Sequence, residues 1–236
     1  MISRLRARIP KFHETKDDTT AAFKPGSVLA INLGKNKSSP VESPDDFVTV
    51  RTYPDFGMTF AIILALSDDP SAVFKIESYE LEPSPITERR PRLVLKVAPD
   101  LEESQIIDIA GPIRKSNIDG VIVSNTSISH PASLTDRGLS GAPLKPRALQ
   151  ALKTLRGHVP ESIPLLGCRG ISTGADALDY ARAGASLVQV HTGFGYDGVG
   201  TCRHIKDEPE ALLRAENTIW KAVVDESVRK LSLTES

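Results

Sequence analysis

The stretch that decides the fold is IPLLGCRGISTGAD, residues 163–176. Its apolar run, glycine-containing turn and Ser-Thr cap predict a buried strand, a tight turn and the first turn of a helix. Backbone N–H groups at such a helix start, approached through residues that lack a Cβ, form an anion site, which phosphate usually occupies. The unexpected residue is Arg169, because an arginine in this turn can either hold an anion or fill its space.

The same alternation of strand and helix extends through much of the chain. Short apolar runs rich in β-formers occupy residues 28–33, 60–66, 93–97, 120–124, 163–166 and 186–191. Helical periodicity follows a cap at Asp100, and recurs over residues 146–156 and from the cap at Ser172 and Thr173 to Gly184. Repeated strand, helix and strand predicts a parallel sheet that is covered on both faces.

Polar or glycine-rich segments follow the ends of most of these strands. They are Asn32, Lys96, residues 124–126, residues 167–170, and His191 with Thr192. A (β/α)8 barrel builds its site at this end of its strands, with phosphate bound by the loops after the last two. We therefore expect an α/β fold of the (β/α)8 TIM barrel type, with an open doubly wound sheet as the alternative.

Composition excludes several functional classes. The chain has 236 residues and a net charge of −1, which gives no electrostatic signature of nucleic-acid binding. Cys168 and Cys202 are too few for a disulfide framework and lack the spacing of a zinc site, so no metal is expected. There is no apolar run of about 18 residues and no apolar signal region, so the sequence as it stands predicts a soluble chain.

Several ordered segments resemble one enzyme family. They are INLGKNKSS, LVLKVAPDL, IDGVIVSNTSISHP, GLSGAPL, GCRGISTGADALDYARAGASLVQVHT and GFGYDGVG. Together they resemble the quinone-dependent (class 2) dihydroorotate dehydrogenases, most of all the fungal ones. The resemblance covers about residues 23–39 and 91–213, whereas residues 40–90 diverge. It implies a single FMN-binding barrel domain over residues 1–236.

The resemblance implies oxidation of (S)-dihydroorotate to orotate in pyrimidine biosynthesis, with FMN as the cofactor and ubiquinone as the electron acceptor. It assigns FMN contacts to Asn32, Lys96, Ser124, Gly141, Gly170, His191 and Thr192. It assigns substrate contacts to Asn125 and Thr126, and no metal. It also implies a place on the mitochondrial inner membrane.

The residue types suit these roles for physical reasons. A cation such as Lys96 beside the flavin's pyrimidine edge stabilises the anionic reduced ring. The amide of Asn125 offers a donor and an acceptor to a pyrimidinedione edge. His191 stands where the family usually has Tyr, and imidazole can still donate a hydrogen bond. Without the resemblance, Lys96 would be interpreted as a strand-end lysine, and Asn125 and the glycines as turn residues.

The sequence departs from the family in the loop that carries the catalytic base. The family has a serine in an Asn-Val-Ser-Ser-Pro-Asn-Thr type loop, and no such loop precedes Pro91 here. Ser67 follows an apolar run, but the Asp-Asp-Pro after it does not reproduce the motif. No catalytic residue is therefore assigned, and loss of a general base typically costs about 10²–10⁴-fold in rate.

Two further departures concern the start of the barrel and the phosphate turn. The family's membrane-associated segment and first strands precede the region that matches RLRARIPKF, so we expect a truncated barrel with unpaired edges. The family has Gly where Arg169 stands, and its side chain either obstructs the FMN phosphate or pairs with it. The alternatives to the family reaction are an inactive paralogue that binds flavin or phosphate, and a phosphate-binding barrel enzyme without flavin.

Overall fold

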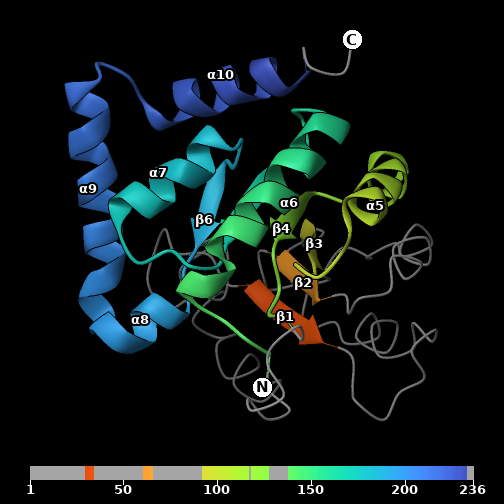
Figure 1. Cartoon of the computed structure of the whole chain (residues 1–236), viewed down its shortest axis with the longest axis horizontal. Helices are drawn as coiled ribbons and strands as arrows, with labels where there is room; N and C mark the ends of the chain where they lie inside the picture. The colour runs from red at the N-terminus through yellow and green to blue at the C-terminus, as the bar shows by residue number, and fades with distance from the viewer. Residues whose placement is uncertain (1–29, 35–60, 66–91, 117, 128–137, 233–236) are drawn as a thin grey trace, which may run out of the picture. The chain divides into compact units, whose positions relative to one another are not determined.

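The computed structural model of the chain describes residues 30–34, 61–65, 92–116, 118–127 and 138–232 (Figure 1). Ser67 and most of the divergent segment 40–90 lie outside the described residues. The chain divides into two compact units. One comprises Met1–Leu95 and Ser116–Asp119, and the other comprises Lys96–Lys115 and Gly120–Ser236.

The first unit contains a pair of parallel strands. β1 (Ala30–Gly34) pairs with β2 (Ala61–Ala65), with Ala30 opposite Ala61. β3 (Arg92–Val97) begins in this unit, where the backbone N–H of Leu93 donates to the Asp119 carboxylate at 2.8 Å. The strands predicted over residues 28–33 and 60–66 are confirmed within two residues at each end.

The second unit has a parallel sheet connected through helices. β4 (Gly120–Val123), β5 (Leu165–Cys168) and β6 (Leu187–Gln189) pair in chain order, and all three are parallel. Its helices are α5 (Glu103–Lys115), α6 (Lys145–His158), α7 (Gly174–Arg182), α8 (Thr192–Asp197), α9 (Thr201–Ala215) and α10 (Trp220–Ser232). Two 3-10 turns, η2 (Ala142–Leu144) and η3 (Gly198–Gly200), precede α6 and α9. The predicted strand–helix alternation is confirmed.

The start of α7 follows the sequence prediction closely. The Thr173 hydroxyl accepts a hydrogen bond from the backbone N–H of Asp176, and the Asp176 carboxylate accepts from the N–H of Thr173, which completes a capping box. Lys145 at the start of α6 donates to Asp176 at 2.5 Å and to Asp179 at 2.8 Å. These bonds join α6 to α7 beside the turn that contains Arg169.

Two helices at the C-terminal end were not predicted. Both α9 and α10 pack on α7, where Figure 1 shows them in dark blue. Their contact is an apolar cluster of Leu178, Ala181, Leu213, Val224 and Val228. In the described part of the chain, no helix has the length and apolar character that crossing a membrane requires.

The start of α5 differs from the expectation. The helix begins at Glu103, later than a cap at Asp100 predicts. The Asp100 carboxylate instead accepts hydrogen bonds from Ser127 at 2.5 Å and Arg147 at 2.8 Å. It therefore ties the residues after β4 to α6.

Candidate functional site

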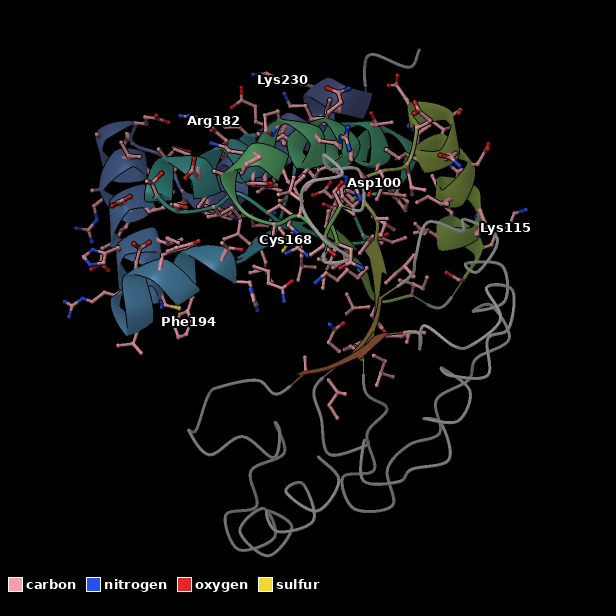
Figure 2. The ribbon with its side chains drawn as sticks, turned by 60° about the horizontal axis from the view of Figure 1, so that its bottom comes forward. Asp100, Lys115, Cys168, Arg182, Phe194 and Lys230 are labelled. Atoms are coloured by element: carbon pink, nitrogen blue, oxygen red, sulfur yellow. The ribbon has the colours of Figure 1, made fainter. Side chains whose placement is uncertain are left out.

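The carboxyl ends of three strands meet at one edge of the second unit. The backbone N–H of Asn125 donates to the carbonyl oxygen of Val97 at 2.6 Å, and that of Ser124 donates to Cys168 at 3.1 Å. Lys96 precedes Val97, and Arg169 follows Cys168. Parallel strands bring such end residues together, as predicted from the sequence. Figure 2 labels Cys168 where side chains gather at this edge.

Arg169 extends its side chain across the site. Its Nε donates to the backbone oxygen of Asn125 at 2.8 Å, and its Nη1 donates to the Ser140 hydroxyl at 3.2 Å. Nη2 lies 3.5 Å from the Asn125 side-chain oxygen. Only 8% of Arg169 is exposed, so the guanidinium points into the site and not out to solvent.

The backbone of Arg169 has the conformation that glycine adopts most readily. Its φ is 111°, which is in the positive region where a Cβ causes strain. The Tyr180 hydroxyl donates to the Arg169 carbonyl oxygen at 2.6 Å. Burial raises the pKa of Tyr180, so this hydroxyl stays protonated and able to donate. The positive φ that the family's glycine suggested is therefore present, with an arginine in it.

Lys96 is a buried amine at the end of β3. It is 8% exposed and makes no hydrogen bond or ion pair with another described residue. Burial lowers the pKa of Lys96, and the nearby charge of Arg169 lowers it further. Burial also raises the pKa of the Cys168 thiol, in keeping with the interpretation of Cys168 as a packed side chain.

A cavity of about 300 Å³ lies next to Arg169. Its lining includes Gly141, Arg169, Gly170, His191 and Thr192, so it unites four of the predicted FMN contacts. Gly141 and Gly170 have φ of 91° and 62°. A Cβ on Gly170 would lie 2.6 Å from the Cβ of Lys145, so only glycine fits there.

Three predicted residues lie elsewhere or at the margin of this cavity. Ser124 is fully buried at the end of β4. Thr126 is half-buried and packs next to Gly138. Asn32 is an exposed residue of β1 in the first unit, and its contact with a flavin stays a prediction.

Two residues of the site were missed in the sequence. Ser140 accepts from Arg169 and shares a hydrogen bond of 2.8 Å with the Thr192 hydroxyl. Gln189 lines the cavity, and its buried side-chain oxygen has no partner within the described part of the chain. The GLSG segment contained a signal for Ser140, whereas Gln189 had none beyond its place near the end of a predicted strand.

Comparison with known proteins identifies the family. The family model described as dihydroorotate dehydrogenase matches residues 11–213. The chain belongs to this family. The match contains every residue assigned above to the dihydroorotate dehydrogenase site, and the recognition made from the sequence is confirmed.

The curated relatives include fungal members of the family. Dihydroorotate dehydrogenase (quinone), mitochondrial, of Schizosaccharomyces pombe is 40% identical over 212 residues, which cover 83% of this chain and 47% of that protein. The protein of the same name from Kluyveromyces lactis is 34% identical over 262 residues, covering 97% and 59%. The chain thus spans about half the length of the curated relatives it matches.

A solved structure shows the same fold. The crystal structure of DHODH from Eimeria tenella in complex with ferulenol matches with a TM-score of 0.74 at 26% identity. The match covers 95% of this chain and 67% of that one. The predicted α/β fold of the TIM barrel family is confirmed.

Proposed function

We propose that this site serves the reaction of the dihydroorotate dehydrogenase family. In that reaction dihydroorotate is oxidised to orotate for pyrimidine biosynthesis, with FMN and then ubiquinone accepting the electrons. The observation that carries the proposal is the buried Lys96, which has no ion-pair partner among the described residues, at the strand edge where Asn125 also lies. A cation in this place suits the reduced, anionic form of a flavin.

The residues at both ends of the site fit FMN. Lys96 and Ser124 would face its ring, while Gly141, Gly170, His191 and Thr192 would surround its phosphate. The two glycines let backbone approach a ligand closely, because a side chain there is excluded by φ or by Lys145. When bound, the flavin supplies the hydride acceptor.

The Arg169 side chain limits the space that is available for FMN. The cavity is at the small end of the range for ligand pockets, about 300–1,000 Å³. The Arg169 side chain fills the space between Asn125 and Ser140. We therefore expect flavin binding to move this side chain away from Asn125.

On the substrate side, Asn125 would orient the pyrimidine through its amide, and Thr126 would contact the same ligand. No general base is assigned to this chain, so we expect a rate below that of the family by up to about 10²–10⁴-fold. The relatives are named mitochondrial, and by the same resemblance we propose the inner membrane as the location and ubiquinone as the final acceptor.

A second candidate function is flavin binding without turnover. Two observations favour it: the Arg169 guanidinium lies within the site, and no catalytic general base is assigned to this chain. A flavin-free phosphate enzyme is less well supported, because phosphate binding alone would not call for both Lys96 and Asn125.

The test is a titration of the purified chain with FMN, followed by dihydroorotate under anaerobic conditions. Binding is measured by quenching of flavin fluorescence and reduction by loss of flavin absorbance. Bound flavin that loses its absorbance supports the dehydrogenase reaction. Bound flavin that stays oxidised supports binding without turnover, and a chain that binds no FMN contradicts both.

A further inference from the structure

A second cavity, of about 660 Å³, lies between β6, α7, α9 and the start of α10 (Figure 1). We call it the Trp220 cavity, after the residue of α10 that lines it. Its volume is within the range of about 300–1,000 Å³ that is usual for ligand pockets. It shares no lining residue with the cavity beside Arg169. A ligand here would therefore be additional to those of the proposed reaction.

The lining of the Trp220 cavity is mainly apolar. Ala177, Ile205 and Leu213 line it and are buried. Leu187 and Ile219 also line it, but they are 60% and 65% exposed. Large apolar side chains that are left exposed in one cavity favour a ligand that removes them from water. We therefore expect an occupant with an apolar body.

The indole of Trp220 is held in place at this cavity. Its Nε1 donates to the backbone oxygen of Ser186, the residue before β6, at 2.9 Å. The ring is partly buried and packs on the apolar cluster of α7, α9 and α10. Because the N–H group of the indole is already satisfied, the ring offers the ligand an apolar surface. The sequence contains one tryptophan, so the intrinsic tryptophan fluorescence of the chain reports on this cavity.

One charged side chain at the Trp220 cavity has no counter-ion among the described residues. Glu210 and Arg214 both line the cavity and form an ion pair of 2.6 Å along α9, so their charges offset each other. Lys206 lies four residues before Glu210, and it makes no hydrogen bond or ion pair with another residue in the described ranges. The lining therefore carries one uncompensated positive charge beside its apolar surface.

We propose that the Trp220 cavity binds an amphipathic carboxylate, namely a free fatty acid of medium chain length. The aliphatic tail covers Leu187, Ile219 and the Trp220 ring, and the carboxylate pairs with Lys206. The long, flexible stem of a lysine lets its ammonium follow a head group at the rim of an apolar cavity. Because exposed ion pairs contribute little free energy, the tail supplies most of the affinity and Lys206 selects the sign of the head group.

The charge of Lys206 also argues against a second copy of this chain as the occupant. An isologous dimer contains the same patch twice, so it would bring two uncompensated Lys206 side chains into one interface. In addition, β6 is the last strand of the described sheet and has only three residues. Such short edge strands are poor templates for pairing with another chain. A fatty acid meets neither obstacle.

The experiment follows the fluorescence of Trp220 while the purified chain is titrated with probes below their micelle-forming concentrations. The probes are decanoate, octanoate, decanol and decyltrimethylammonium, which differ in tail length or in head-group charge. We expect decanoate to shift the emission saturably and to bind most tightly. Octanoate lacks two methylenes and should bind up to about 15-fold more weakly. Decanol and decyltrimethylammonium should each bind several-fold more weakly than decanoate.

Two substitutions at exposed positions separate the head group from the tail. Lys206→Gln should weaken decanoate binding to the level of decanol and leave decanol binding unchanged. Ile219→Ser should weaken decanoate and decanol alike. The matched controls are Lys153→Gln, at an exposed lysine of α6, and Val199→Ser, at an apolar residue that is 86% exposed. Both control residues lie outside the Trp220 cavity, so neither substitution should change the binding of any probe.

Three fluorescence results would each overturn the proposal: no saturable change in emission, decyltrimethylammonium binding as tight as that of decanoate, or a decanoate affinity that Lys206→Gln leaves unchanged. Sedimentation velocity tests the other occupant. A dimer that Ile219→Ser dissociates would show that a second copy covers the cavity, and would also overturn the proposal. The outcome is independent of the proposed function, because neither Lys206→Gln nor Ile219→Ser should change the affinity for FMN.

Discussion

The Tyr180 hydroxyl in α7 lies 2.6 Å from the carbonyl oxygen of Arg169 in the turn after β5, and it donates a hydrogen bond to that oxygen. The ring of Tyr180 is fully buried against Gly167, where any Cβ would collide with it. The Tyr180 side chain thus connects α7 to Arg169, whose own side chain crosses the site. It fixes the backbone while the guanidinium is held by Asn125 and Ser140.

Tyr180→Phe should therefore reduce stability. Removing the hydroxyl leaves a buried carbonyl oxygen unsatisfied, and we expect a loss of about 1–3 kcal/mol in the free energy of unfolding. Urea denaturation measures this loss. Tyr196→Phe is the control, because Tyr196 is 87% exposed, and it should leave stability unchanged. Equal stability of the two variants would show that the bond to Arg169 contributes nothing.

Arg169→Gly should increase FMN affinity. The substitution relieves a positive φ of 111° and clears the space between Asn125 and Ser140. We expect FMN to bind at least several-fold more tightly, measured by quenching of flavin fluorescence.

The matched control for Arg169→Gly is Asn217→Gly. Asn217 also has a positive φ, 50°, but it lies after α9 and not at the site. Its replacement should leave FMN affinity unchanged. Weaker FMN binding by Arg169→Gly than by the parent chain would show that the arginine pairs with the phosphate and does not obstruct it.

Features of the fold and of the candidate site could be predicted where they depend on residues close together in the sequence. The strands and α7 were predicted because their signals are local, such as the apolar run of β5 and the cap at Thr173. The gathering of Lys96, Asn125 and Arg169 followed from one rule about parallel strands. Such features need only the sequence and a fold class.

The direction of the Arg169 side chain could not be predicted in this way. The sequence left both obstruction and phosphate pairing open, because the choice depends on Asn125 and Ser140, which are 44 and 29 residues away. The helix α9 was missed for a different reason. In the sequence, the glycines before α9 and Pro209 within it indicate an interruption of the helix. Packing on α7 stabilises the helix in spite of these residues.

The capping carboxylate of α7 should make stability depend on pH. Burial alone raises the pKa of Asp176, but hydrogen bonds from Lys145, Ser172 and Thr173 outweigh burial and lower the pKa to about 2. An unfolded aspartate titrates near 3.9. The stabilisation is therefore complete above about pH 4 and is lost as the pH falls toward 2.

Asp176→Asn should unfold more readily than the parent chain at pH 7, by about 1–2 kcal/mol after solvent screening. The difference in free energy of unfolding between the two chains should shrink between pH 4 and pH 2. Denaturant titrations at several pH values measure it. Asp207→Asn, in an exposed pair with Arg203, serves as the control and should have little effect. A difference that stays constant from pH 7 to pH 2 would contradict the assigned pKa.

The loop between α6 and β5 depends on a buried arginine. Arg156 is 2% exposed and donates to the carbonyl oxygens of Val159, Pro160 and Ile163. Its side chain packs directly on Gly184, which follows α7 and has a φ of 94°. A Cβ at Gly184 would lie 2.7 Å from the Cγ of Arg156, so both the backbone and the space exclude a side chain.

Gly184→Ala should destabilise the chain by about 1–3 kcal/mol, since it combines a strained φ with a shift of the Arg156 side chain. Gly111→Ala is the matched control, because Gly111 lies within α5 with open space around its Cβ position. Alanine is the better helix former, so this control should raise stability by up to about 1 kcal/mol. Thermal and urea unfolding of both variants measure the difference. If Gly184→Ala is as stable as Gly111→Ala, Arg156 is free to move, and the carbonyl groups that it binds do not fix the entry to β5.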